Sequence, residues 1–318
     1  MEKIFLTEHI HDDAVAYLKE HFEVVQGTST EVSEIIRQAQ GCAGILIRSA
    51  KITAEIMDAI PTLKVIAKHG MGVDNIDVAH ATEKGILVVN APYSNMNAVA
   101  EHIVTLLLAL SKRIVRMDRL TRNGGFAQRN TYKTMELKDA TVGIVGMGKI
   151  SRLVVKKLSA FDMHIIASDP FVKQENVGDL PVRMTSAEEV YSTSDFVVVH
   201  TSLFPSTFHL VGAEQFRMMK PTAYIINAAR GPIIDEAAMI EALKDGEIAG
   251  AGLDVFEQEP PVEGNPLFDM DNVIVSPHNA ALCDGALRAM AMDSAQGITE
   301  YLTGQAVSYP VNREVLEK

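Results

Sequence analysis

The sequence predicts an α/β protein built from two successive domains, each with a parallel sheet and flanking helices. Apolar, β-branched runs alternate with helical patterns over about the first ninety residues and again after Thr141, which is the pattern of βα units. The chain has 318 residues, enough for about two domains. Its hydrophobic fraction of 47% is that of a globular protein with a substantial core.

In the first part, the expected strands are KIFLT, FEVV, AGILIR, KVIAKHG and ILVVN. The helical patterns between them are DDAVAYLKEHF, EVSEIIRQAQ, TAEIMDAI and NIDVAHATEKG. Asp12 or Asp13 is the expected N-cap of the first helix, and we prefer this to a metal site at His9 and His11. A long helical pattern, roughly Asn97 to Leu120, joins the two parts.

In the second part, the expected strands are TVGIVG, HIIASD, FVVVH, AYIINAA, GAGLD and NVIVSPH. Helical stretches separate most of these strands. A final helical pattern from near Asp284 to about Thr303 follows the last strand. Because the second sheet is then complete, we expect this helix to return to the first domain.

The segment from Thr141 to Phe161 joins a strand to a helix through a glycine turn, Gly146-Met147-Gly148. Such a turn lets the backbone approach a dinucleotide pyrophosphate, which the N–H groups and the dipole of the helix N-terminus attract. The third small position of this fingerprint is Ser151, whose side chain is expected to shift the helix slightly.

Asp169 ends the strand after this helix, about 20 positions beyond the glycines, where an acid can bind an adenosine ribose. A carboxylate there repels a 2′-phosphate. The sequence therefore predicts NAD as the cofactor and disfavours NADP.

Composition excludes several classes of protein. The formal charge is −12, without a Lys/Arg cluster, which argues against a nucleic-acid partner. The sequence shows no membrane-span pattern, no N-terminal signal pattern and no metal-binding motif. The two cysteines, Cys42 and Cys283, are far apart, so a reduced, cytoplasmic protein is expected.

Three chemically complementary residues follow strands of the second part: Arg230, Glu259 and His278. Ligands of open α/β sheets bind beyond the carboxyl ends of the strands. A guanidinium can hold a carboxylate and polarise a carbonyl. An imidazole can transfer a proton near neutral pH, and a carboxylate can orient it. Together the three residues suit reduction of a 2-oxo acid by hydride, or the reverse oxidation.

Six segments resemble the D-isomer-specific 2-hydroxyacid dehydrogenases: HGMGVDNID, GMGKIS, HTSLFPST, NAARGPIIDE, AGLDVFEQEP and SPHNA. They cover the whole chain in order, and the chain is most similar to the D-3-phosphoglycerate dehydrogenase branch. It ends at Lys318, so a short form without a C-terminal regulatory domain is expected.

The resemblance implies a role for each matching residue. The catalytic residues are Arg230, Glu259 and His278. The cofactor-binding residues are Gly146, Gly148, Lys149, Ile150, Asp169, Thr201, Ala228, Ala229 and Asp254. The substrate-binding residues are Arg48, Ser49, Gly70, Met71, Gly72 and Arg230.

The family fold implies two Rossmann-like domains with a cleft between them. On this basis we expect a discontinuous substrate domain of residues 1–97 plus 283–318, and a dinucleotide-binding domain of residues 98–282. A homodimer through the glycine-turn domain and the Asn97–Leu120 region is expected. Ser202, Cys283 and Asp284 depart from the family pattern, which loosens the assignment to phosphoglycerate.

Other functions remain open at this point. Hydroxypyruvate, glyoxylate and bulkier 2-oxo acids are alternative substrates. A corepressor-like NAD-sensing protein on the same fold can keep the catalytic residues. A formate dehydrogenase is disfavoured, because such enzymes use a glutamine near the position of Glu259.

Overall fold

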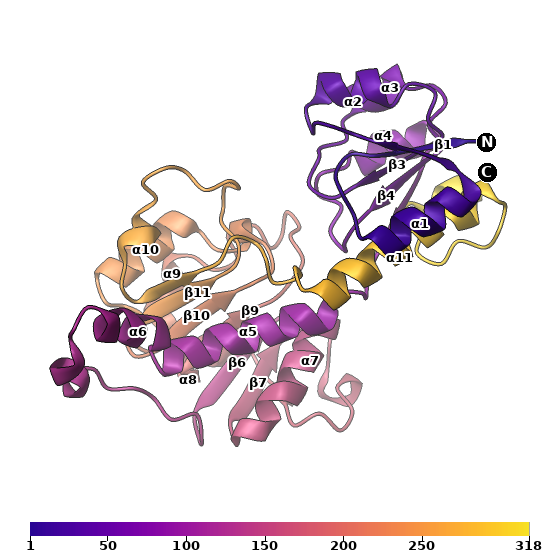
Figure 1. Cartoon of the computed structure of the whole chain (residues 1–318). Helices are drawn as coiled ribbons and strands as arrows, with labels where there is room; N and C mark the ends of the chain where they lie inside the picture. Colours follow the sequence, from indigo (N-terminus) through magenta and orange to yellow (C-terminus); the bar gives the residue numbers. More distant parts are fainter. Residues whose placement is uncertain (318) are drawn as a thin grey trace. The chain divides into compact units, whose positions relative to one another are not determined.

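The computed structural model describes residues 1–317 and contains two compact units (Figure 1). Unit 1 consists of Met1–Asn95 and the chain from Ala281 onward, and unit 2 consists of Met96–Ala280. The α/β class expected from the alternating pattern is confirmed, since both units are built on parallel sheets.

Unit 1 has a five-stranded parallel sheet in the order β2-β1-β3-β4-β5. The strands are β1 Lys3–Leu6, β2 Glu23–Gln26, β3 Gly44–Ile47, β4 Val65–Lys68 and β5 Leu87–Asn90. The central strands are buried on both faces, as apolar runs in a parallel sheet require.

Each face of this sheet has its own helices (Figure 1). The helices α2 Val32–Gln38, α3 Ala54–Ala59 and α4 Val78–Glu83 contribute to one apolar cluster. The helices α1 Asp12–His21 and α11 Asp284–Leu302 contribute to the other. Ala291, Ala295 and Ile298 of α11 are buried in that second cluster, so the last helix belongs to the core of unit 1.

Unit 2 has a seven-stranded parallel sheet in the order β12-β11-β10-β9-β6-β7-β8. The strands are β6 Thr141–Val145, β7 His164–Ser168, β8 Arg183–Met184, β9 Phe196–Val199, β10 Tyr224–Asn227, β11 Gly250–Leu253 and β12 Val273–Val275. The first strand of the unit, β6, lies between β7 and β9. Chain order therefore reverses at β6, which is where open α/β sheets bind ligands.

The helices of unit 2 also form two layers (Figure 1). The helices α5 Met96–Ser111 and α7 Lys149–Leu158 pack on each other, and α5 also contacts β10 and β11. The helices α8 Ala187–Thr193, α9 Ala213–Met218 and α10 Glu236–Lys244 share an apolar cluster with the strands on the other face.

Two local expectations were wrong. The N-cap of α1 is His11, whose Nδ1 accepts a hydrogen bond from the Asp13 backbone N–H, while the Asp13 carboxylate pairs with Arg288 of α11. The helical pattern beyond α5 is broken at Arg113, which has a left-handed φ of 50°, and resumes as α6 Ile114–Arg122.

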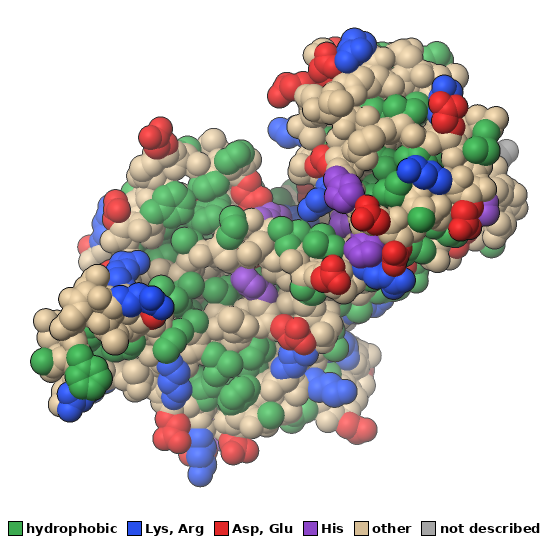
Figure 2. Space-filling model, in the orientation of Figure 1, with side chains coloured by type: hydrophobic (Ala, Val, Ile, Leu, Met, Phe, Trp, Pro, Cys, Tyr) green, Lys and Arg blue, Asp and Glu red, His purple; other side chains and the backbone are tan. Residues whose placement is uncertain are grey.

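Within residues 1–317, no helix combines the length and apolar character needed to cross a membrane. Figure 2 shows Lys and Arg side chains interspersed with Asp and Glu on the visible face of each unit.

Candidate active site

Most of the candidate residues of unit 2 lie at one edge of its sheet. Gly146 follows β6, Asp169 follows β7 and Thr201 follows β9. Arg230, Asp254 and His278 follow β10, β11 and β12. Because the strands are parallel, their carboxyl ends share one edge, and the topology brings these residues together.

The glycine turn has the geometry of an anion cradle. Gly146 has a φ of +94°, and a Cβ there would lie 2.4 Å from the His200 carbonyl oxygen. A Cβ on Gly148 would meet nothing within 4 Å. Among the described side chains, none caps α7, which begins at Lys149. The open side of Gly148 and the uncapped helix start fit a pyrophosphate.

Asp169 contacts this turn directly. Its Oδ2 accepts a 2.7 Å hydrogen bond from the Met147 backbone N–H, and its Oδ1 accepts one of 2.8 Å from Phe171. A carboxylate offers about four acceptor positions, so acceptor capacity remains for a ribose hydroxyl. Thr201 also adjoins the turn, since its Cβ would lie 3.1 Å from a Cβ on Gly146.

Ser151 is buried in α7, and its hydroxyl has no hydrogen-bond partner among residues 1–317. The helix therefore accommodates the serine without satisfying its polar atom. The feature that distinguishes Ser151 from a glycine at this position is therefore a buried hydroxyl without a partner among the described residues.

The turn after β10 presents Arg230. Asn227 holds this turn, because its Nδ2 donates to the Arg230 carbonyl oxygen and its Oδ1 accepts from the Ala229 N–H. Ala228 and Ala229 are buried, while Arg230 is half-buried and donates from Nη1 to the Ala229 oxygen. The turn thus displays the guanidinium beyond the strand on a fixed backbone.

His278 and Glu259 form a direct pair, with 2.7 Å between Nδ1 and Oε2. Burial opposes ionisation of Glu259 most strongly, but the hydrogen bond and charge of His278, the Phe256 N–H and the charge of Arg230 lower its pKa. Arg230 therefore acts electrostatically on the same carboxylate that His278 contacts. The three candidate catalytic residues form one cluster.

Asp254 is fully buried beneath the loop that carries His278. Its carboxylate accepts hydrogen bonds from Ser276 Oγ at 2.6 Å and from the backbone N–H groups of Asn279 and Ala280 at 3.0 Å. The His278 N–H donates to the Asp254 carbonyl oxygen. Asp254 thereby stabilises a loop in which His278 has a left-handed φ of 49°.

In unit 1, the loop Gly70-Met71-Gly72 follows β4. Gly70 has a φ of +135°, and within residues 1–317 none of the three N–H groups of this loop donates a hydrogen bond. Free N–H groups of this kind can bind an anion. The preceding His69 is buried and its Nε2 contacts the Leu287 oxygen of α11; burial, and then the charge of Arg48, lowers its pKa to about 4.

Arg48 and Ser49 follow β3 and are held by Glu8. The Glu8 carboxylate accepts from the backbone N–H groups of Arg48 and Ser49 and from the Ser49 hydroxyl. Both donors of Ser49 are therefore engaged within unit 1. The Arg48 side chain donates from Nη1 to the His9 carbonyl oxygen.

Two residues that contact these candidates do not emerge from sequence reasoning. Asn227 lies within the NAARG segment, and its tendency to form turns is the signal that could have identified it. Glu8 is 41 residues from Ser49, and their contact depends on β1 lying next to β3. No local pattern carries that information.

The chain is similar to known proteins along its whole length. Residues 104–280 match the family described as D-isomer specific 2-hydroxyacid dehydrogenase, NAD binding domain. A D-3-phosphoglycerate dehydrogenase of Methanocaldococcus jannaschii is 40% identical over 98% of the chain, and the chain spans 60% of that relative's length. A glyoxylate reductase of Thermofilum pendens is 39% identical, with 99% of the chain and 96% of the relative covered.

A solved structure extends the likeness to the fold. The NADPH-dependent glyoxylate/hydroxypyruvate reductase of Sinorhizobium meliloti, in complex with NADP and malonate, is 28% identical with a TM-score of 0.87, and 98% of this chain and 97% of that chain are covered. The family match and the nearly full-length relative agree with the glycine turn, the strand-end cluster and the parallel sheets. The chain belongs to the family of D-isomer-specific 2-hydroxyacid dehydrogenases.

Proposed function

We propose that this protein is an NAD-dependent enzyme that interconverts a D-2-hydroxy acid and its 2-oxo acid. The observation that carries the proposal is the 2.7 Å His278–Glu259 pair, which lies at the sheet edge that also bears the glycine turn and Arg230. A proton-transferring imidazole beside a dinucleotide cradle is what a hydroxyacid dehydrogenase requires.

The chain's own residues divide the chemistry between them. When bound, the nicotinamide supplies or accepts the hydride at C2 of the substrate. His278 gives a proton to the C2 oxygen during reduction and takes one during oxidation. Glu259 holds the Nδ1 side of the ring, which leaves Nε2 for the substrate. Arg230 binds the substrate carboxylate and polarises the carbonyl.

Other candidate residues support binding. Gly146, Gly148, Lys149 and Ile150 are proposed to hold the pyrophosphate, and Asp169 the ribose. Thr201, Ala228, Ala229 and Asp254 are proposed to flank the nicotinamide. In unit 1, the free N–H groups of Gly70, Met71 and Gly72 are proposed to bind a carboxylate.

We further propose NAD rather than NADP, because the Asp169 carboxylate lies beside the turn. The similarity to an NADPH-dependent reductase makes this a point to measure. Initial rates with NADH and NADPH at equal 2-oxo acid concentration decide it. A higher kcat/KM with NADPH would contradict the assignment.

For the substrate, we propose 3-phosphoglycerate and 3-phosphohydroxypyruvate first, and glyoxylate or hydroxypyruvate as the alternative. The relatives include both a phosphoglycerate dehydrogenase and a glyoxylate reductase. The partly exposed Arg48 side chain offers a positive charge to a second anionic group. NADH oxidation with phosphorylated and unphosphorylated three-carbon 2-oxo acids tests this, and a higher kcat/KM for the unphosphorylated acid selects the alternative.

We also propose a homodimer that forms through unit 2. Several large apolar side chains there are exposed, among them Ile114 at 55%, Val115 at 46%, Phe126 at 65% and Phe268 at 47%. Light scattering on Val115→Glu and wild-type protein tests the proposal. A wild-type monomer would rule it out.

A further inference from the structure

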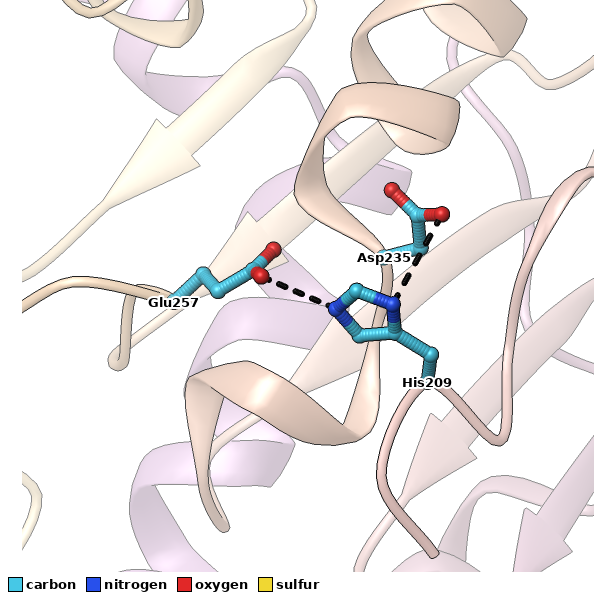
Figure 3. A group of neighbouring side chains, drawn as sticks. All are labelled: His209, Asp235 and Glu257. Carbon is cyan, nitrogen blue, oxygen red and sulfur yellow. Dashed lines mark hydrogen bonds and ion pairs between the residues drawn. The ribbon is translucent and has the colours of Figure 1, made fainter.

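His209 lies between two carboxylates in unit 2 (Figure 3). Its Nε2 is 2.9 Å from Glu257 Oε1, and its Nδ1 is 3.8 Å from Asp235 Oδ2. The ring also stacks on that of Phe208, with 4.0 Å between centroids. Because a carboxylate only accepts hydrogen bonds, the Nε2–H donates to Glu257.

These three side chains come from three different segments. His209 lies on the loop after β9, and Asp235 is the N-cap of α10, where its Oδ1 accepts from the Ala238 N–H. Glu257 lies on the loop after β11. Glu257 and Glu236 exchange hydrogen bonds, since the N–H of each donates to the carboxylate of the other at 3.0 Å.

The backbone of His209 is fixed against the segment that follows Arg230. The His209 N–H donates to the Pro232 oxygen at 2.8 Å, and the Val211 N–H donates to the Ile233 oxygen at 3.1 Å. A Cβ on Gly231 would lie 1.8 Å from the Phe256 oxygen. The Arg230 turn and the Glu257 loop are therefore in direct backbone contact.

The same loop carries Glu259. Two residues after Glu257, the Glu259 Oε1 accepts from the Phe256 N–H at 3.1 Å, and its Oε2 accepts from His278. The hydrogen bond between Phe256 and Glu259 closes a turn in this loop, and Glu257 holds the loop to His209 and Glu236. We therefore expect a shift of Glu257 to move Glu259, which lies two residues away and contacts His278.

The contact is a hydrogen bond rather than a metal site. The three side chains offer ligand atoms within 4.8 Å of one another, but the two carboxylates face opposite nitrogens of the ring (Figure 3). A single ion can bind only one nitrogen of an imidazole, so it could not account for both contacts, and 2.9 Å between Nε2 and Oε1 is the length of a direct hydrogen bond.

We propose that His209 is a positioning residue for the Glu259–His278 pair, holding the Glu259 loop against the segment after Arg230. This inference rests on the proposed function of that pair. His209 has a left-handed φ of 49°, a conformation that histidine and asparagine tolerate better than most residues. His209→Asn therefore removes the reach to Glu257 with little backbone cost, and His209→Gln keeps an amide donor of similar reach.

The first arm of the test is kinetic. In His209→Asn we expect kcat for 2-oxo acid reduction to fall by roughly 10-fold to 100-fold, the scale of a small misplacement of a catalytic group. KM and the NADH Kd should stay near wild type. His209→Gln should recover most of the rate, and exposed His164→Asn on β7 is the matched control. In a Glu259→Gln background, His209→Asn should add little, because the two act through one group.

The second arm does not require turnover. The His278 ring proton resonance, assigned with His278→Asn, should move in the same direction in His209→Asn as in Glu259→Gln. An unchanged resonance, or a rate loss fully additive with Glu259→Gln, overturns the inference. The inference is also overturned if a chelator lowers the rate of the wild type but not the rate of His209→Asn. That result would indicate a metal site instead. A wild type without turnover rejects the proposed function, while the resonance still decides the role of His209.

Discussion

The Nδ1–H of His278 donates a 2.7 Å hydrogen bond to Glu259 Oε2. The bond fixes the ring tautomer, because a carboxylate accepts and cannot donate when ionised. It joins two loops that follow neighbouring strands, β11 and β12. In the proposed mechanism, the proton that moves is therefore on the other nitrogen, Nε2.

Removing the His278 imidazole should greatly lower the rate of the reaction and leave cofactor binding unchanged. In His278→Ala, kcat for 2-oxo acid reduction should fall by about 10² to 10⁴, the usual range for loss of a general acid. The NADH Kd, measured by fluorescence titration, should match wild type, since the glycine turn is untouched. His164→Ala, at an exposed residue of the buried strand β7, is the control, and an unchanged kcat in His278→Ala would refute the proton-transfer role.

The charge of Asp169 should set the preference between the two nicotinamide cofactors. Asp169→Asn keeps an oxygen that can accept from the Met147 N–H but removes the charge that repels a 2′-phosphate. The ratio of kcat/KM for NADPH to that for NADH should rise at least about 10-fold. Two unit charges about 4 Å apart near a protein surface interact by about 4 kcal/mol, which is more than this change requires.

The control for this ratio is Asp179→Asn, which removes an exposed charge elsewhere in the same unit. It should leave the ratio at the wild-type value. If Asp169→Asn also leaves the ratio unchanged, then the cofactor preference is decided by other groups.

The strands were predictable because parallel strands buried on both faces are continuous apolar runs. The His278–Glu259 pair, separated by 19 residues, was predictable as a cluster because both follow strands of one sheet. The break in the helix at Arg113 was not predictable, because the apolar spacing continues through this residue. Only its left-handed φ of 50° separates α5 from α6.

Contacts that depend on strand order were also beyond the sequence. Glu8 meets Ser49 because β1 and β3 are neighbours, and His209 meets Glu257 because their loops flank the segment after β10. Polar groups without a local motif acquire partners only once the topology is fixed.

Replacing Ser151 should stabilise the protein. Its hydroxyl is buried without a partner among residues 1–317, and an unpaired buried polar group costs about 1–3 kcal/mol. Ser151→Ala should raise the free energy of unfolding by about 1 kcal/mol, given also the higher helix propensity of alanine. Urea denaturation measures the change.

A buried serine of the opposite kind provides the comparison. Ser294 donates to the Lys68 and Met290 oxygens, so Ser294→Ala should lower the free energy of unfolding. A Ser151→Ala variant that is also destabilised would show that its hydroxyl is paired in solution.

Glu8 should make the stability of unit 1 depend on pH in the acid range. Burial alone raises the pKa of Glu8, but hydrogen bonds from Ser49, Thr7 and Arg48 outweigh it and lower the pKa from 4.5 to about 2. The folded state thus favours the ionised form. Its contribution is complete above pH 4.5 and is lost as the pH falls from there toward about 2.

Glu8→Gln removes the charge that these donors meet, so it should destabilise the protein by about 1–3 kcal/mol at pH 7. The difference from wild type, followed by urea denaturation, should shrink steadily below pH 4.5, because protonation makes the wild-type carboxyl neutral as well. Glu20→Gln, at an exposed residue of α1, should show no comparable difference. An equal difference in the free energy of unfolding between wild type and Glu8→Gln at pH 7 and at pH 3.5 would contradict this prediction. The Glu8 carboxylate would then not be the group that these hydrogen bonds stabilise.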